Sequence, residues 1–143
     1  MKRPKATNTE MIFPGGSMIT ETDLKGLITF ANRKFMEMTG YDLDELIGIP
    51  HSIIRHPDMP KEAFRDMWAT IQEGKEWNGY VKNLRKDGAF YWVHVFVTPK
   101  FEDAKMIGYI AARKIPDAYG LNKAKELYPK LLEEEKSNKA KNS

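Results

Sequence analysis

Three alternating segments in the second half of the chain constrain the fold more than any other feature. Residues 77–84 alternate imperfectly between apolar and polar side chains, residues 90–98 form a long aromatic run, and residues 106–114 complete the series. Residues 85–88 (Arg-Lys-Asp-Gly) have the composition of a hairpin turn, and residues 99–105 form a second turn. Strands that follow one another through short turns pair antiparallel, so the sequence predicts three consecutive antiparallel strands.

A second hairpin near the start of the chain adds two strands to this prediction. Residues 18–20 begin one strand, residues 23–26 (Asp-Leu-Lys-Gly) supply the turn, and residues 27–30 return. Two strands followed later by three give a five-stranded antiparallel sheet.

Helical spacing replaces the alternation between the two sets of strands. Asn32 is expected to cap a short helix that Gly40 ends, and residues 41–48 repeat the arrangement. Pro60 opens the longest helix of the domain, residues 61–73, whose apolar side chains recur on one face and predict that this face is buried. Several short helices after a hairpin indicate an α+β fold in which helices cover one face of the sheet.

Residues 53–58, with the sequence Ile-Ile-Arg-His-Pro-Asp, form a polar ridge between these short helices and the long one. The ridge brings together the guanidinium of Arg55, the imidazole of His56 and the carboxylate of Asp58. In a turn these three groups converge on one ligand with both donors and acceptors. The alternative is a surface loop in which Asp58 caps the following helix.

Composition excludes several classes of function. The chain has 143 residues and a net charge of +3, from 23 basic against 20 acidic residues, with no arginine-rich stripe, so a nucleic-acid surface is not indicated. It has no cysteine, which removes disulfides, cysteine metal sites and cysteinyl photo-adducts. The apolar runs are far shorter than the roughly 20 residues that span a bilayer, and no signal peptide is evident, so we expect a cytoplasmic protein without membrane insertion.

The two ends of the chain differ from the middle. Residues 1–16 are predicted to be a flexible N-terminal arm, residues 17–115 the folded domain, and residues 116–143 a C-terminal segment. Apolar residues three and four apart in that segment, interrupted by Pro129, predict one or two short amphipathic helices, with residues 133–143 frayed. The segment either packs on its own domain or docks on a partner.

The short motifs of residues 18–114 resemble, in their order and spacing, those of a PAS domain. These motifs are the Asp23-Leu24-Lys25-Gly26 turn, Phe30-Ala31-Asn32 with Phe35, Thr39-Gly40-Tyr41, Glu45-Leu46-Ile47-Gly48 and Lys86-Asp87-Gly88. Five further runs, residues 54–60, 67–68, 77–79, 81–83 and 91–93, resemble the flavin-binding PAS domain of bacterial aerotaxis, or energy-taxis, receptors. The resemblance implies a PAS fold that holds FAD noncovalently and reports through its redox state on respiration and oxygen.

The resemblance also implies which residues contact the cofactor. In that family the Arg-His-Pro-Asp run and the Trp and Asn of the third strand are tied to flavin binding, and two further positions match. The implied residues are Arg55, His56, Asp58, Trp77, Asn83, Asn32 and His51. For His51, polar packing is an equal alternative, and Trp77 and Asn83 have the alternative of being ordinary sheet residues.

The chemistry of a flavin suits these residue types. An isoalloxazine ring is a flat amphiphile that needs aromatic or aliphatic walls and a few hydrogen-bond partners. The candidate walls are Trp68, Trp77, Tyr91 and Trp92. The Asn83 amide suits the pyrimidine edge, and we expect its hydrogen bonding to change on reduction. Arg55 and His56 suit a pyrophosphate or an anionic reduced ring, and Asp58 orients one of them or caps a helix.

The predicted function is therefore a non-enzymatic redox or oxygen sensor, because no nucleophile, phosphate loop or acid–base pair accompanies the pocket. Two alternatives remain open: a heme-binding oxygen sensor with His51 or His56 as iron ligand, and a cofactor-free dimerisation module. The expected partner is a membrane chemoreceptor or chemotaxis signalling protein, in cis or in trans, which would hold the chain at the inner face of the membrane. Pairing of two copies through the N-terminal segment is also expected.

Overall fold

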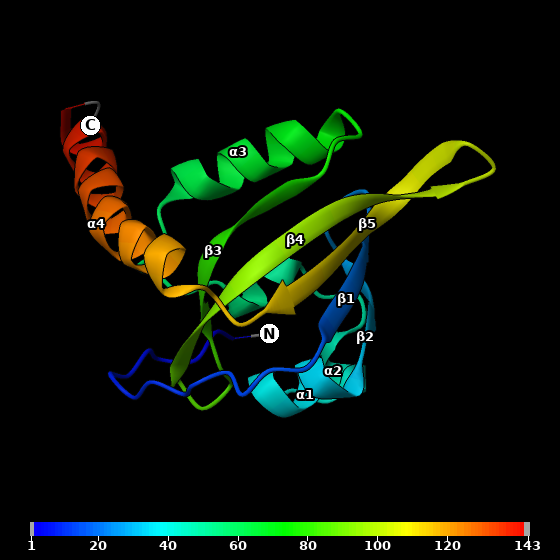
Figure 1. Ribbon diagram of the computed structural model, residues 1–143, viewed down its shortest axis with the longest axis horizontal. Coiled ribbons are helices and arrows are strands. Elements are labelled where there is room, and N and C mark those ends of the chain that lie inside the picture. The colour runs from blue at the N-terminus through cyan, green and yellow to red at the C-terminus, as the bar shows by residue number, and fades with distance from the viewer. Residues whose placement is uncertain (1, 142–143) are drawn as a thin grey trace.

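One antiparallel sheet of five strands organises the computed structural model, which describes residues 2–141 (Figure 1). The strands are β1 (Met18–Asp23), β2 (Ile28–Ala31), β3 (Trp77–Leu84), β4 (Phe90–Glu102) and β5 (Lys105–Lys114). Their order across the sheet is β2-β1-β5-β4-β3, so the three late strands form the predicted series and the early hairpin joins it through β1 and β5. The predicted α+β fold with a five-stranded antiparallel sheet is confirmed.

Four short helices connect β2 to β3. They are α1 (Arg33–Thr39), α2 (Leu43–Leu46), the 3₁₀ helix η1 (His51–Ile54) and α3 (Lys61–Gln72). Asn32 caps α1 as predicted, since its Oδ1 accepts a hydrogen bond of 3.0 Å from the Phe35 amide. Pro60 precedes the first turn of α3 instead of lying within it, and no side chain of its own segment caps that helix.

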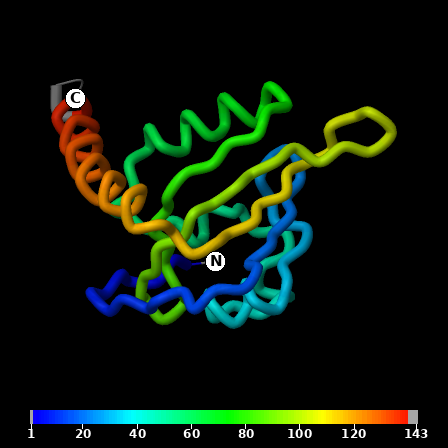
Figure 2. Tube along the Cα trace, in the orientation of Figure 1, coloured from blue at the N-terminus to red at the C-terminus, as the bar shows by residue number. Residues whose placement is uncertain are grey.

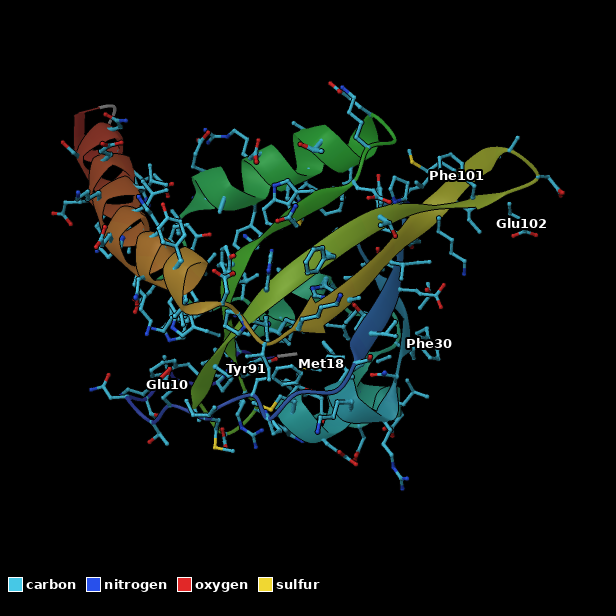
Figure 3. The ribbon with its side chains drawn as sticks, viewed as in Figure 1. Glu10, Met18, Phe30, Tyr91, Phe101 and Glu102 are labelled. Atoms are coloured by element: carbon cyan, nitrogen blue, oxygen red, sulfur yellow. The ribbon has the colours of Figure 1, made fainter. Side chains whose placement is uncertain are left out.

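The core lies between the sheet and these helices. In β4 every second side chain from Tyr91, which is 0% exposed, to Val97 is buried, and the residues between them face outward. Tyr91 and Met18 therefore lie in the interior, whereas Phe101 and Glu102 lie where the β4–β5 hairpin projects beyond the sheet (Figure 3).

The N-terminal arm runs beside the turn between β3 and β4 (Figure 2). The Thr7 amide donates to the Gly88 carbonyl at 2.9 Å, and the Met11 amide donates to the Phe90 carbonyl at 2.7 Å. Gly88 has φ +91°, and a Cβ there would lie 2.3 Å from the Lys5 carbonyl oxygen, so only glycine permits this approach. Phe13 anchors the end of the arm in the core with 3% exposure.

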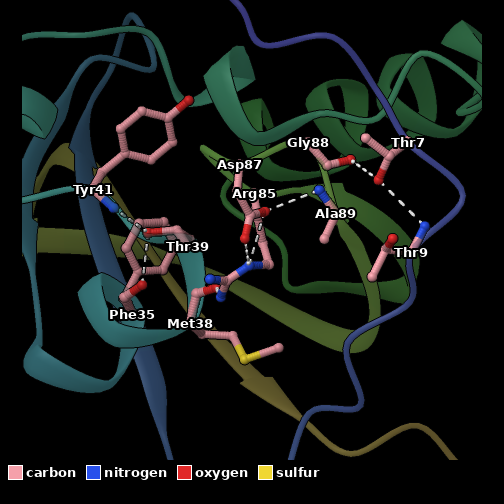
Figure 4. Close-up of polar contacts among 10 residues, drawn as sticks. All are labelled: Thr7, Thr9, Phe35, Met38, Thr39, Tyr41, Arg85, Asp87, Gly88 and Ala89. Atoms are coloured by element: carbon pink, nitrogen blue, oxygen red, sulfur yellow. Dashed lines mark hydrogen bonds and ion pairs between the residues drawn. The ribbon is translucent and has the colours of Figure 1, made fainter.

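The turn itself is tied to α1 by side chains (Figure 4). Arg85 donates to the Met38 carbonyl and pairs with Asp87, whose Oδ1 accepts from the Ala89 amide at 3.0 Å. The predicted hairpin turn at residues 85–88 thus also joins the sheet to the first helix.

The C-terminal segment forms one helix, α4 (Ala118–Lys141), beside the β3 edge of the sheet (Figure 1). The prediction of one or two short helices with a frayed end is corrected: a single helix of 24 residues passes through Pro129, and the predicted frayed residues 133–141 are helical. Contacts on both sides of the proline offset the backbone hydrogen bond that it removes. Tyr128 donates to the Tyr80 carbonyl at 2.6 Å, and the Glu135 carboxylate accepts from the Lys61 and Glu62 amides. Residues 142–143 lie outside the described part.

Within residues 2–141, no helix combines the length and the apolar character that crossing a membrane requires.

Candidate functional site

A cavity of about 320 Å³ lies between the inner face of the sheet, η1 and α3. The face of α3 that the sequence predicts to be buried lines it with Phe64, Met67, Trp68 and Ile71. The sheet contributes the inward-facing residues Trp77, Val81, Asn83, Val95, Val97, Tyr109, Ala111 and Arg113. The walls are thus mainly apolar and aromatic, and a few polar groups interrupt them.

Two tryptophans on this wall are held by specific contacts. The Trp77 indole donates to the Asp66 carboxylate of α3 at 2.9 Å, which joins the edge strand to the helix. Trp68 meets Tyr109 edge to face, with ring centroids 5.7 Å apart. A Cβ at Gly26 would lie 3.1 Å from the Trp68 ring, so the turn between β1 and β2 closes tightly on that side.

Arg55 and Asn83 lie together where η1 ends against β3. Their backbones form an isolated antiparallel bridge, and the Arg55 guanidinium lies 3.7 Å from the centre of the Phe64 ring. The Arg55 Nε–H is buried and has no hydrogen-bond partner among the described residues. The Asn83 amide is 3% exposed and donates to the Tyr91 hydroxyl over 3.5 Å, a long hydrogen bond that leaves it available to a ligand.

His51 and Arg113 form the other polar part of the wall. The Arg113 guanidinium donates to His51 Nε2 at 2.6 Å, and Nε2 also lies 3.1 Å from the Thr20 hydroxyl. Since a guanidinium has no acceptor, His51 Nε2 carries no proton and the neutral ring is protonated at Nδ1. Burial, with Arg113 close by, lowers the pKa of His51 to about 3.

Five of the sequence-predicted site residues line the cavity: His51, Arg55, Trp68, Trp77 and Asn83. They come from η1 and its end, from α3 and from β3.

The structure places the remaining predicted residues outside the cavity lining. Asn32 caps α1 and also accepts from the Ile19 amide, and Trp92 faces away from the cavity, stacked against Tyr128 of α4. Tyr91 lies one layer behind, with its hydroxyl against Asn83, and burial raises its pKa to about 12.

His56 and Asp58 do not line the cavity either. The Nδ1 of His56 accepts from the Asp58 amide at 3.0 Å, and the His56 ring lies edge-on to Phe90. Asp58 pairs with Lys82 at 3.0 Å and does not cap α3. The polar ridge is therefore split: Arg55 faces the cavity, and the residues after it brace β3.

Arg113 lines the cavity but was not predicted from the sequence as a site residue. A signal for it exists in β5, where Tyr109, Ala111 and Arg113 occupy alternate positions and so share one face. An arginine on the inward face of a central strand is unusual, because a buried charge is costly unless it has a function or a partner.

The fold and the cavity define the class of the protein, and the comparisons agree with it. A family model described as the PAS fold matches residues 28–113, more than half of the chain. The chain belongs to the PAS family.

Within that family it is a PAS sensor domain related to a receptor. It is 47% identical over 97 residues to the aerotaxis receptor of Escherichia coli (strain K12), an alignment that covers 68% of this chain and 19% of the receptor. It is 29% identical over 125 residues to a nitrogen fixation regulatory protein of Klebsiella pneumoniae, with 86% of this chain and 25% of that protein covered. The chain thus spans about a fifth to a quarter of the length of these relatives.

Solved structures share the fold. A light-oxygen-voltage domain studied with a flavin analogue aligns with a TM-score of 0.66 at 21% identity, over 79% of this chain and 86% of that one. The PAS domain of a protein from Colwellia psychrerythraea aligns with a TM-score of 0.64 at 24% identity, over 70% of this chain and 86% of that one. At these identities the likeness concerns the fold.

Proposed function

We propose that this chain is a redox sensor that holds FAD noncovalently in the cavity and transmits the redox state of the flavin to a chemotaxis-type signalling partner. The observation that carries the proposal is the cavity itself: its walls are apolar and aromatic, and Arg55 and Arg113 each keep a buried Nε–H without a partner among the described residues. Similarity to an aerotaxis receptor over 68% of the chain supports the sensing role.

The residues present fit an isoalloxazine ring. The cavity volume of about 320 Å³ lies at the lower end of the range for small-molecule sites, which is roughly 300–1,000 Å³. A cavity of this size suits the isoalloxazine ring, and the rest of FAD would lie outside it. Trp77 and Trp68 offer flat walls, and Asn83 offers an amide donor and acceptor. The lining residues Lys25, Pro50 and Ser52 are exposed and form the rim of the cavity. The ribityl chain and the phosphate groups of FAD would extend past this rim toward the solvent.

When bound, the flavin would supply reversible uptake of electrons, with a proton added at N5. This chain would supply the hydrogen bonds that respond. An amide can exchange an acceptor for a donor by rotating. Asn83 lies on β3, and Tyr80 of the same strand accepts a hydrogen bond from Tyr128 of α4. A change at Asn83 would therefore alter β3 and, through it, the C-terminal helix.

The same similarity supports a proposal for the partner of the chain and for its location in the cell. The proposed partner is a membrane chemoreceptor or another chemotaxis protein, joined in cis or in trans, which would keep the domain at the inner face of the membrane. A second copy of the chain, paired through the N-terminal arm, completes the proposed assembly.

Heme binding gains no support from the site. The Nε2 atom of His51 is already occupied by Arg113 and the Thr20 hydroxyl, and the Nδ1 atom of His56 accepts from the Asp58 amide. Iron binding at His51 Nε2 or at His56 Nδ1 would first have to break these contacts. The Nε2 atom of His56 has no hydrogen-bond partner among the described residues, but His56 does not line the cavity.

One purification tests the proposal. The protein is expected to purify yellow, with the two broad absorption bands of an oxidised flavin, and acid should release a chromophore that elutes with FAD and not with FMN. A Soret band would support the heme sensor instead. A colourless protein that also fails to take up added FAD would leave only a scaffold for protein contacts.

A further inference from the structure

Arg113 is a buried charged residue, and its hydrogen-bond partners among the described residues are all uncharged. It is 1% exposed. Its Nη1 donates to the Thr20 hydroxyl at 3.2 Å and to the Ala111 carbonyl at 3.3 Å, and its Nη2 donates to His51 at 2.6 Å. Its Nε–H is also buried and has no partner among residues 2–141. The guanidinium thus makes three of the five hydrogen bonds that its N–H groups allow, and none of these partners carries an opposite charge.

The lining of the cavity as a whole carries an excess of positive charge. Three of its lining residues, Lys25, Arg55 and Arg113, are cationic, and none of the lining residues that the structure describes is an aspartate or a glutamate. His51 is neutral, because burial and Arg113 lower its pKa to about 3. Burial also lowers the pKa of Arg113, to about 10, so its guanidinium stays protonated at neutral pH.

A buried charge without a counter-charge costs free energy unless a ligand supplies the missing charge. Arg113 lies on the same face of β5 as Tyr109 and Ala111, and all three line the cavity. A ligand atom that accepts a hydrogen bond would supply the partner that the Arg113 Nε–H lacks, and the interaction would be stronger if that atom carried negative charge.

We propose that Arg113 contacts the bound flavin ring and makes the cavity bind its negatively charged, reduced form more tightly than its neutral, oxidised form. This inference rests on the proposed function. It adds the residue that contacts the ring and states which redox form of the flavin the cavity prefers. The alternative is that Arg113 only positions His51, in which case its loss would change stability and overall affinity but not the preference between the two redox forms.

The test compares two variants of Arg113 with a matched control. Arg113→Met removes the charge at similar length, and Arg113→Lys keeps the charge but removes the Nε–H and the bidentate geometry. Lys114→Met removes the same charge from the next residue, whose side chain is exposed and lies over Phe96 on the opposite face. The reduction potential of bound FAD, measured against that of free FAD under argon, gives the ratio of the dissociation constants of the oxidised and reduced forms.

Arg113→Met is expected to lower this ratio by about tenfold or more, the scale of one charge-assisted hydrogen bond, while Lys114→Met leaves it within about twofold of the wild type. Arg113→Lys should weaken binding of both forms and keep most of the ratio. An unchanged ratio in Arg113→Met overturns the inference while leaving FAD binding intact. If circular dichroism shows that this variant does not fold, Arg113→Lys decides: loss of the preference despite the retained charge overturns the inference. Failure of the wild type to bind FAD overturns both this inference and the proposed function.

Discussion

His51 accepts a hydrogen bond from Arg113 across 2.6 Å, which joins the 3₁₀ helix η1 to the last strand at the wall of the cavity. The two residues are separated by 62 positions in the chain, so this contact forms only when the whole sheet is assembled. Burial and, after it, the nearby Arg113 charge lower the pKa of His51 to about 3, so the imidazole is neutral and accepts from the guanidinium.

The first prediction concerns pH. The pKa of His51 falls from 6.5 to about 3 on folding, so between these values the unfolded chain binds a proton that the folded chain does not. The contribution of His51 to stability is therefore complete above pH 6.5, and the free energy of unfolding decreases as the pH falls, by up to about 1.4 kcal/mol per pH unit.

Urea denaturation at pH 7.5, 6.0 and 5.0 measures this slope. In the variant His51→Gln, whose side-chain oxygen still accepts from Arg113 but does not titrate, the slope should be smaller. Equal slopes in the two proteins would contradict the neutral, buried state of His51.

The second prediction concerns Asn83. Replacing Asn83 with Ala removes an amide from the cavity wall and should weaken FAD binding by about tenfold, the scale of one hydrogen bond to a buried group. Asn78→Ala, on the same strand but exposed and in contact with His94, is the matched control and should bind FAD like the wild type. Redox-dependent partner binding that persists in Asn83→Ala would refute the switching role of this amide.

The third prediction concerns Gly79, which lies two residues from Trp77 on the same face of β3. A Cβ at this position would lie 2.5 Å from the Trp77 ring, so Gly79→Ala must turn the indole away from its place between β3 and α3. We expect the hydrogen bond from Trp77 to Asp66 to break and FAD affinity to fall. Tryptophan fluorescence and FAD titration follow the two effects. Unaltered fluorescence and affinity would show that Trp77 is not fixed as the structure describes it.

The fourth prediction concerns the contact between the C-terminal helix and α3. The carboxylate of Glu135 accepts hydrogen bonds of 3.0 and 3.1 Å from the amides of Lys61 and Glu62, and so caps a helix that has no cap of its own. Glu135→Ala should lower the free energy of unfolding by about 0.5–2 kcal/mol and make the distal half of α4 more sensitive to proteases. Glu134→Ala, the exposed neighbour, should do neither. Equal behaviour of the two variants would count against this contact in solution.

The sequence predicted the sheet because its signals are local. Alternation in β4, the turn at residues 85–88 and the cap at Asn32 each depend on neighbours within a few residues. The prediction for α4 was wrong because it took Pro129 as the end of a helix. Contacts with Tyr80 and with α3 hold the helix on both sides of the proline, and these partners are distant in the sequence.

The candidate site was predictable only in part for the same reason. Arg55, Trp77 and Asn83 belong to runs that resemble known flavin-binding motifs, and the structure brings them to one cavity. His56 and Asp58 belong to such a run too, but the chain turns after Arg55 and directs them against β3. Arg113 lies in no such motif, and its importance follows from the period of β5 and from partners on β1 and η1.

The central claim is that the space between the sheet and α3 holds the flavin ring, and one pair of substitutions tests it most directly. Ala111 lines the cavity, whereas the adjacent Ala112 faces the opposite side of the sheet, where it lies beside Ile19 and Phe96. Ala111→Phe should fill the cavity without unfolding the protein and abolish FAD binding in a titration, while Ala112→Phe should bind FAD as the wild type does. Full FAD affinity in a folded Ala111→Phe variant would show that the flavin, if bound at all, lies elsewhere.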